Sequence, residues 1–372
     1  MLKNKEAKEL YESFSKEEKQ RLEKYNHEEL YYKKCEKTNL KAIAAIHTSK
    51  LGPLVSSEGD KIWATGGTRF YNYKNEFEAL IDALRLSEGM SRKNAVAGVK
   101  MGGSKCVIIG DPKTLKTPEL LRSYGEFIEE LGGKLNTGED MNINQEDVKI
   151  MAQTTKFTRL MTGGKKNVGT ITTVPTARGV FRGIQAGAFE VWGNKSLKGK
   201  TVAVQGIGGV GYLLCKWLYE DGANIIVSDI NEEATRRAEN EFGAKSVHVN
   251  EILNIECDVF SPCAGGGIVD SETAKSIKVK LIAGAANNVL KEIKDGDILH
   301  ERGILYIPDY VINAGGVISV EHQVSGEYDI EKINERLDNI YTAVSNIIKL
   351  AKEKNIPTSK AADEYADEII NR

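Results

Sequence analysis

Cysteine, proline and charge of one sign are all scarce in this sequence of 372 residues, which has five cysteines, seven prolines and a formal net charge of −2. The cysteines are scattered and odd in number, and none forms a Cys-x-x-Cys pair, so neither a disulfide scaffold nor a zinc site is indicated. The 51 basic and 53 acidic residues leave no basic excess of the kind that nucleic-acid-binding proteins show. No apolar run approaches the roughly 18 residues that cross a bilayer. We therefore expect no nucleic-acid partner, no membrane partner and no metal site.

The N-terminus also lacks a continuous apolar stretch, so no secretory signal is indicated and a cytoplasmic location is expected. Glycine, in contrast, is abundant, with 36 residues in a chain that is 41% apolar. This combination is typical of a globular α/β enzyme with tight turns between strands and helices. At roughly 150 residues per domain, the length predicts two or three domains.

Hydrophobic spacing predicts short helices and strands in the first half of the chain. Near the N-terminus apolar residues recur at helical spacing, and Ser15 and Glu18 form a capping box; a frayed polar terminus is the alternative. Between the first two predicted strands lies a loop rich in glycine and serine, LGPLVSSEGDKIWATGG. The spacing predicts strands near 40–48, 67–73 and 106–112, and helices over 75–91 and 117–131.

The pattern changes in the second half. A Gly/Thr-rich stretch at 161–173 is interpreted as the connection between two domains. Beyond it, helices alternate with short apolar runs, which suit parallel strands covered on both faces. A long helix is predicted over 330–354, and the end of the chain is expected to return to the first domain. The predicted fold is therefore α/β with two domains, one of residues 1–160 joined by 345–372 and one of residues 161–344.

A glycine fingerprint, Gly206-x-Gly208-x-x-Gly211, follows an apolar strand and opens a helix. Gly206 makes the tight turn, Gly208 lets the backbone approach a pyrophosphate, and Gly211 allows close packing of helix and strand. Asp229 ends the next strand, where it can accept hydrogen bonds from the adenosine ribose. Its carboxylate would repel a 2′-phosphate, so the pattern favours NAD over NADP, although two arginines follow on the next helix. The alternative is a glycine turn in an α/β fold that binds no ligand.

Three lysines, Lys93, Lys100 and Lys105, surround a Gly-Gly turn directly before a buried strand. A lysine held near other cations in a closed site has a lowered pKa and can act as a base, and another can bind a carboxylate. Taken alone, lysines whose stems lie along the surface are the alternative. Farther along, Glu139 and Asp140 lie in a Gly-flanked turn, where a carboxylate can exchange protons with a lysine or simply cap a turn.

The combination resembles the amino acid dehydrogenase family of leucine, phenylalanine, valine and glutamate dehydrogenases, and most of all its leucine and phenylalanine branch. The resemblance runs from about residue 26 to the C-terminus. The matching segments are, in order, HEELYY, LKAIAAIHTSKLGP, GGTRFYNY, DALRLSEGMSRKNAVAG, MGGSKCVIIGDP, TGEDMN, VPTARGV, GKTVAVQGIGGVG, GAANNVL and PDYVINAGGVISV.

This resemblance implies a first domain for substrate binding and oligomerisation and a Rossmann domain for NAD, with the substrate between them. By the same resemblance Lys105 is the catalytic lysine that activates water, Lys93 binds the substrate α-carboxylate, and Asp140 is the acid–base partner of the amine. The backbone of Gly66 and Gly67 packs against the substrate. The resemblance also places Asn313 beside the substrate or the cofactor amide, Thr176 and Asn287 near the nicotinamide, Gly209 and Val210 in the glycine turn, and Cys263 and Ala264 in the wall behind the cofactor.

The reaction implied is the reversible oxidative deamination of an L-amino acid to a 2-oxo acid and ammonia. Glutamate enzymes carry a lysine before the Gly-Gly pair and a hydroxyl residue on a later helix; this chain has Thr65 and Val320 there. A side-chain carboxylate would therefore be left unpaired, whereas Val317 and Val320 suggest an apolar pocket. Leucine or another branched-chain substrate is favoured. An aromatic substrate is the alternative, because Gly138 leaves more space than alanine.

Some features depart from the leucine enzymes. About ten extra residues follow Pro53 at the rim of the substrate pocket, and Trp63 among them is expected either to cap that pocket or to touch another subunit. Lys100 and Ser104 also replace the residues that are usual there. A rival reading is an NAD-binding regulatory protein without catalysis, which the joint presence of Lys93, Lys105 and Asp140 argues against. The family's habit predicts a homo-oligomer.

Overall fold

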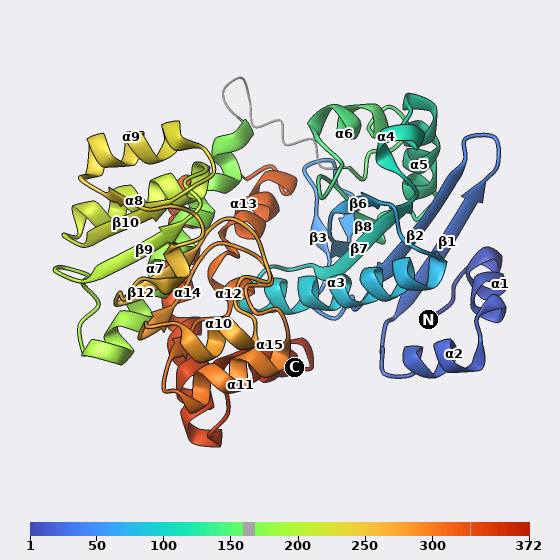
Figure 1. Cartoon of the computed structure of the whole chain (residues 1–372). Helices are drawn as coiled ribbons and strands as arrows, with labels where there is room; N and C mark the ends of the chain where they lie inside the picture. Colours follow the sequence, from blue (N-terminus) through green and yellow to red (C-terminus); the bar gives the residue numbers. More distant parts are fainter. Residues whose placement is uncertain (159–167, 328) are drawn as a thin grey trace. The chain divides into compact units, whose positions relative to one another are not determined.

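The computed structural model describes residues 1–158, 168–327 and 329–372, without the side chains of 168–171. The chain forms two compact units. The first contains the described residues of 1–168, with 323–327 and 370–372, and the second contains those of 169–322 and 328–369. Each unit has its own sheet (Figure 1). Each also has its own cluster of buried apolar residues.

The first unit is built on a mixed sheet with the strand order β1-β2-β7-β5-β8, in which β6 also pairs with β7. The pairs β1–β2 and β2–β7 are antiparallel, whereas β5, β6 and β8 lie parallel to their neighbours. Strand β5 pairs with Gly102 and Gly103 at the start of β7, whereas β6 pairs with residues 106–109 of β7 and β8 pairs with β5. The strands are β1 (Glu29–Cys35), β2 (Leu40–Ile46), β5 (Ala64–Thr65), β6 (Thr68–Tyr71), β7 (Gly102–Ile109) and β8 (Leu135–Asn136).

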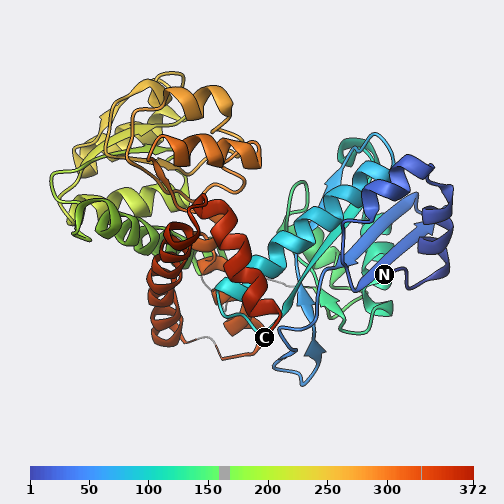
Figure 2. The same cartoon turned by 90° about the horizontal axis from the view of Figure 1, so that it is seen from below.

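Helices cover this sheet. On one face α3 (Glu76–Val96) lies along β7, with the N-terminal helices beside it (Figure 2). Phe14, Phe77 and Leu80 belong to the apolar cluster that joins them. The capping box of Ser15 and Glu18 is confirmed at the start of α2. The helix predicted over 75–91 is present and continues for another turn. The other helices of this unit are α1 (Lys5–Ser13), α2 (Lys16–Leu22), α4 (Pro112–Leu115), α5 (Pro118–Glu130) and α6 (Gln145–Met151).

The glycine- and serine-rich loop contains a β-hairpin. Strands β3 (Leu54–Val55) and β4 (Lys61–Ile62) pair antiparallel. Their turn is closed by the Ser56 side chain, which accepts the Asp60 N–H at 3.1 Å, and Gly59 supplies the positive φ of 87° that the turn requires. Strands of two residues carry no detectable alternation, which explains why the sequence pattern predicted a loop.

The second unit contains a parallel sheet with the order β11-β10-β9-β12-β13-β14, as the alternating strand–helix pattern predicted. From β9 the strands follow one another in sequence toward one edge as β10 and β11 and toward the other as β12, β13 and β14, as in doubly wound dinucleotide-binding folds. Its strands are β9 (Thr201–Gln205), β10 (Asn224–Ser228), β11 (Lys245–Ser246), β12 (Val259–Pro262), β13 (Leu281–Ile282) and β14 (Leu305–Tyr306). Its helices are α7 (Val168–Trp192), α8 (Gly209–Glu220), α9 (Glu232–Phe242), η1 (Ile252–Asn254), α10 (Ser271–Ser276), α11 (Ile293–Glu301), α12 (Asp309–Ile312), α13 (Gly315–Val324), α14 (Ile330–Lys354) and α15 (Thr358–Ile370).

The unit boundaries differ from the predicted domains 1–160 with 345–372 and 161–344. Of the predicted connection 161–173, residues 161–167 lie outside the described part, and Val168 already begins α7. Helix α14 has the predicted bounds, but the chain after it stays in the second unit until Ile370. Two contacts tie α15 to this unit: the Thr358 hydroxyl donates to the Tyr306 carbonyl, and Lys360 pairs with Asp297 at 2.6 Å.

Across the described residues, no helix combines the length and apolar character that a membrane crossing requires.

Candidate active site

The face of the first sheet that α3 covers carries the predicted catalytic residues. Register pairs Thr65 with Gly103 and Thr68 with Cys106, so Gly67 lies opposite Lys105. Side chains alternate along strands, so Lys105 and Gly103 point to the same face. A Cβ built on Gly103 would lie 2.1 Å from the Ser91 backbone nitrogen, which identifies this as the α3 face.

Lys105 and Asp140 form a direct ion pair there, with Lys105 Nζ on Asp140 Oδ2. The Lys105 side chain is 7% exposed and that of Asp140 is 20% exposed. Burial lowers the pKa of the Lys105 ammonium below its ordinary value, and the Asp140 charge only partly opposes this. Burial alone would raise the pKa of Asp140, but Lys105, the Met141 N–H and Arg69 outweigh it, so that pKa is lowered. The pair thus combines a carboxylate with a lysine that loses its proton readily.

Arg69 is a third member of this cluster that sequence reasoning missed. Its Nε donates to Asp140 Oδ1 at 3.3 Å, and a terminal nitrogen donates to Asp82 Oδ2 at 2.9 Å. The Tyr73 hydroxyl donates to the same Asp82 oxygen at 2.7 Å. The signal was the arginine of the GGTRF motif within a predicted strand. Its side chain is only 19% exposed, and a largely buried guanidinium needs an anionic partner.

The glycines of the site permit backbones to approach closely. A Cβ on Gly66 would lie 1.8 Å from the Ser104 carbonyl oxygen, and one on Gly67 would lie 3.0 Å from Asp140 Cβ. The buried Gly138 accepts the Thr68 N–H at 2.9 Å, which fixes the turn before Asp140. The predicted glycines therefore lie next to the Lys105–Asp140 pair.

The other lysines differ in exposure. Lys93 is half-buried in the last turn of α3, the helix that packs on β7. Lys100, in the turn between α3 and β7, is exposed. Trp63 is 39% exposed and lies beside Glu28, Glu29 and Lys134, away from the cavity that the rest of the insertion borders.

In the second unit the glycine fingerprint forms the turn between β9 and α8. Gly206 has a φ of 92°, and a Cβ on Gly211 would lie 1.9 Å from the Gly206 carbonyl oxygen. Gly208 is the N-cap of α8 and makes no side-chain cap, and a Cβ there would meet nothing within 4 Å. The N-terminus of α8 therefore has no side-chain cap, and Gly208 leaves space for a ligand to approach the backbone, which fits a dinucleotide pyrophosphate.

Asp229 lies directly behind this turn. Its carboxylate accepts the Ile207 N–H at 2.6 Å and the Asn231 N–H at 2.8 Å. A cavity of about 550 Å³ adjoins it, and its walls include Arg236 and His248. A carboxylate that accepts hydrogen bonds, next to an open glycine turn, fits an adenosine with free ribose hydroxyls.

The remaining predicted cofactor residues of this unit lie on neighbouring turns. Ala264 is within 3 Å of a Cβ built on Gly206, and Cys263 Cβ is 3.5 Å from one built on Gly211. Asn313 Nδ2 donates to Asn287 Oδ1 at 2.8 Å, so these two amides form one pair. Gly209 and Val210 begin α8, Thr176 lies in α7 within 3.2 Å of a Cβ built on Gly316, and Val317 and Val320 lie on α13.

Among the residues the structure describes, no group of His, Cys, Asp and Glu side chains could hold a metal ion. The cysteines are all free.

Comparison with known proteins decides the family. Residues 28–157 match the family described as Glu/Leu/Phe/Val dehydrogenase, dimerisation domain, and residues 228–370 match Glutamate/Leucine/Phenylalanine/Valine dehydrogenase. The chain belongs to the Glu/Leu/Phe/Val dehydrogenase family. The resemblance inferred from the motifs and the two-domain α/β fold are thereby confirmed.

Within this family of amino acid dehydrogenases, relatives match over nearly the whole chain. Leucine dehydrogenase of Geobacillus stearothermophilus is 46% identical over 351 residues, which are 94% of this chain and 92% of the relative. Phenylalanine dehydrogenase of Thermoactinomyces intermedius is 41% identical over 356 residues, which are 94% and 93% of the two chains. The crystal structure of L-tryptophan dehydrogenase from Nostoc punctiforme has a TM-score of 0.82 at 40% identity and covers 95% of this chain and 98% of that one.

Proposed function

We propose that the protein catalyses the reversible, NAD-dependent oxidative deamination of an L-amino acid with an apolar side chain, leucine first among them, to the 2-oxo acid and ammonia. The observation that carries the proposal is the buried Lys105–Asp140 pair, in which Lys105 has a lowered pKa. A buried lysine with a lowered pKa gives up its proton more easily and can then act as a base, and a carboxylate beside it can exchange the proton.

The residues divide the work as follows. Lys93 stays charged and holds the α-carboxylate, while the backbone of Gly66 and Gly67 borders the substrate. Asp140 takes a proton from the α-ammonium group, so that the lone pair of the resulting amine can expel the hydride from Cα. A bound nicotinamide supplies the hydride acceptor. Lys105 then removes a proton from the water that attacks the iminium carbon, which gives a carbinolamine. Asp140 returns its proton to the amino group, and as the carbinolamine hydroxyl loses its proton to solvent the C=O bond forms and ammonia leaves.

An apolar side chain is favoured over glutamate. Thr65 replaces the lysine that glutamate enzymes place before the Gly-Gly pair, and Val320 replaces their hydroxyl residue. The side-chain carboxylate of a glutamate substrate would then be desolvated without a partner, which is unfavourable by several kcal/mol. The leucine dehydrogenases at 44–46% identity support leucine ahead of an aromatic substrate.

NAD is the proposed cofactor. The pyrophosphate is expected at the N–H groups of Gly208, Gly209 and Val210, and the ribose hydroxyls at Asp229. The negative charge of Asp229 opposes a 2′-phosphate. Thr176, Asn287, Cys263 and Ala264 are the proposed lining of the nicotinamide half, with Asn313 positioned through its bond to Asn287.

We further propose that the enzyme works as a homo-oligomer in the cytoplasm. The match of residues 28–157 to a family described as a dimerisation domain supports the oligomer. Size-exclusion chromatography with light scattering at micromolar concentration tests this, and a monomeric mass would contradict it.

The test of function is NADH formation at alkaline pH with each of the twenty L-amino acids. Leucine, isoleucine or valine is expected to give the highest kcat/KM. Glutamate at the top would contradict the argument from Thr65. If NAD binds but no amino acid is oxidised, the proposed activity is wrong.

A further inference from the structure

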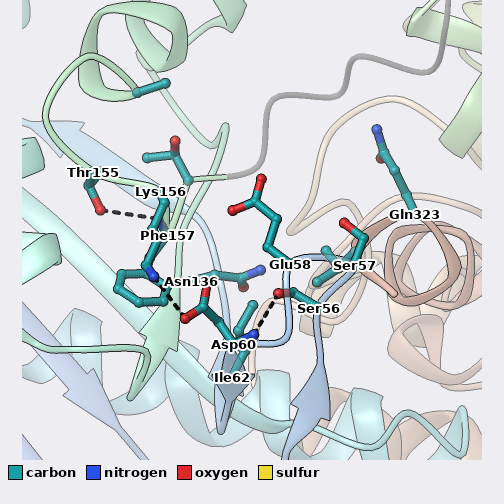
Figure 3. A pocket seen from close by; sticks show the side chains of 13 residues that line it. Ser56, Ser57, Glu58, Asp60, Ile62, Asn136, Thr155, Lys156, Phe157 and Gln323 are labelled. Atoms are coloured by element: carbon teal, nitrogen blue, oxygen red, sulfur yellow. Dashed lines mark hydrogen bonds and ion pairs between the residues drawn. The ribbon is translucent and has the colours of Figure 1, made fainter. Parts of the chain in front are cut away.

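Each unit has a cavity within the range of about 300–1,000 Å³ that small-molecule sites occupy. In the first unit a cavity of about 400 Å³ lies beside the β3–β4 hairpin, where Lys156 and Asp60 pair with each other at 2.8 Å (Figure 3). In the second unit a cavity of about 550 Å³ lies beside Asp229, and Arg236 is one of its walls. Arg236 matters because its charge is held much less firmly than that of Lys156.

One face of α9 forms a wall of the second cavity. Glu232, Thr235 and Arg236 all border it. Positions i, i+3 and i+4 lie on the same face of a helix, so this spacing presents the three side chains together. Arg237 follows one position later, about 100° farther round the helix, and is not part of this wall.

The two arginines of α9 also differ in their partners. Arg237 Nε donates to Glu241 Oε1 at 2.8 Å, and a terminal nitrogen donates to the Tyr212 hydroxyl at 2.7 Å. The Arg237 guanidinium lies 3.9 Å from the centroid of the Tyr212 ring. Arg236 Nε donates to the Glu232 carbonyl at 3.3 Å, and its ion pair with the Glu232 carboxylate is 3.8 Å long and 68% exposed on the arginine side. Arg237 is therefore engaged, whereas Arg236 can turn its terminal nitrogens toward a ligand.

The charges around this cavity have both signs. Asp229 and Glu232 contribute carboxylates, Arg236 contributes a guanidinium, and His248 adds an imidazole. In the proposed function Asp229 accepts the ribose hydroxyls, so we expect the 2′ position of the adenosine at this cavity. A phosphate monoester there carries a charge of about −1.5 to −2. The carboxylates repel such a group, but a guanidinium can bind it through two parallel hydrogen bonds.

We propose that Arg236 forms a latent site for the 2′-phosphate of NADP, which the charge of Asp229 masks in favour of NAD. The inference rests on the proposed function, because it takes this cavity as the adenosine end of the dinucleotide site. It adds a residue that attracts the phosphate to the one that repels it. Loss of Asp229 therefore gives a site that binds NADP through Arg236, rather than one that merely ceases to discriminate.

Binding of adenosine 2′,5′-bisphosphate and of adenosine 5′-monophosphate to the full chain tests this without a catalytic step. Isothermal titration calorimetry at low salt gives both dissociation constants. The wild type is expected to favour the monophosphate, and Asp229→Asn is expected to shift the ratio toward the bisphosphate. Adding Arg236→Gln to Asp229→Asn should weaken bisphosphate binding by about tenfold, as loss of a hydrogen bond to a charged group does, and leave monophosphate binding unchanged.

Arg237→Gln in the Asp229→Asn background is the matched control, because it removes the same charge one position away. Bisphosphate binding is expected to stay within about twofold, as for an exposed charge that makes no contact with the ligand. Should Asp229→Asn fail to fold, Arg236→Gln and Arg237→Gln in the wild-type background give the same comparison.

Two results would overturn the inference while the proposed function stands. One is bisphosphate binding that Arg236→Gln does not change, which would leave Arg236 as a surface partner of Glu232. The other is an equal loss in the Arg236 and Arg237 variants, which would show a general effect of positive charge. If neither nucleotide binds to any of the proteins at millimolar concentration, the cavity does not take adenosine, and the proposed cofactor is wrong as well.

Discussion

Arg69 and Lys105 hold opposite oxygens of one carboxylate. Arg69 Nε donates to Asp140 Oδ1, and Lys105 Nζ contacts Oδ2. Arg69 is itself tied to Asp82, which also accepts the Tyr73 hydroxyl. Asp140 therefore lies between a cation that is fixed and always charged and one that can lose its proton. This arrangement keeps Asp140 ionised and orients it toward the base.

Removing the fixed cation should move the pH profile. The Arg69 charge lowers the pKa of Lys105, so in Arg69→Met the ammonium becomes more stable and the base is free only at higher pH. We expect the rising limb of kcat/KM for deamination to move up by about one pH unit, with a loss of about tenfold at neutral pH. Initial rates between pH 7 and 11 measure this.

Arg85→Met is the control for that variant. Arg85 also donates to Asp82, at 3.0 Å, but it makes no bond to Asp140. Its pH profile should overlay that of the wild type. If the pH profile of Arg69→Met also overlays that of the wild type, Arg69 does not lower the pKa of Lys105.

Loss of the proposed base should abolish turnover without affecting the dinucleotide. Lys105→Ala is expected to lower kcat by at least about 10²–10⁴-fold, the usual contribution of a general base. NADH binding, followed by fluorescence titration, should be unchanged because the glycine turn belongs to the second unit. Lys100→Ala, from the same segment but exposed, should keep its activity. Activity of Lys105→Ala within tenfold of the wild type would exclude Lys105 as the base.

The sequence was most informative where the relevant residues are local. The turn from Gly206 to Gly211 and the strand ending at Asp229 form one strand–helix–strand unit, and spacing alone placed them. Arg69 and Asp140 are 71 positions apart. Backbone hydrogen bonds on either side of Arg69 bring them together, because the Thr68 N–H donates to the Gly138 carbonyl and the Phe70 N–H donates to the Met141 carbonyl. Such a contact leaves no periodic signal.

Other misses follow from weak local signals and tertiary packing. The strands of the β3–β4 hairpin are too short to show alternation. The stretch around Thr173 and Pro175 resembles a loop in composition, but it forms the first turns of α7. Buried apolar residues later in the same helix, such as Val180 and Ile184, show that packing overrides the poor helix propensity of glycine, threonine and proline.

His27 should make stability fall in mild acid. Its Nε2 lies 3.0 Å from the Leu84 carbonyl and 2.9 Å from Ser87 Oγ, and burial, with His47 beside it, lowers its pKa to about 3. Below the unfolded value of about 6.5 the unfolded chain therefore binds the additional proton, and stability is lost as pH falls toward 3. The loss is about 2 kcal/mol at pH 5.

Thermal unfolding of the wild type and of His27→Gln at pH 7 and pH 5 measures this loss. The variant should lose less stability than the wild type over this interval. His300→Gln, at an exposed position, should behave as the wild type does. Equal pH dependence in all three proteins would contradict the role of His27.

The charge of Asp229 should set the choice of cofactor. Asp229→Asn keeps an oxygen for one of the backbone N–H groups of Ile207 and Asn231 but removes the negative charge. We expect the ratio of kcat/KM for NAD to that for NADP to fall by about tenfold, since a charge–charge term of about 1.4 kcal/mol is lost. Glu233→Gln, exposed on α9, should leave the ratio unchanged. An unchanged ratio in Asp229→Asn would remove Asp229 from the selection.

Gly66 should tolerate no side chain, whereas another glycine of the same unit should accept one. A Cβ at Gly66 would lie 1.8 Å from the Ser104 carbonyl oxygen, so Gly66→Ala must push β5 away from β7 and should lower the free energy of unfolding by about 3 kcal/mol. Gly89 is exposed in α3, and a Cβ there meets nothing within 4 Å. Gly89→Ala should therefore raise the free energy of unfolding by about 1 kcal/mol, the difference in helix propensity. Denaturant unfolding of both variants decides the matter, because equal stability of Gly66→Ala and the wild type would mean that the backbones beside Lys105 are not in close contact.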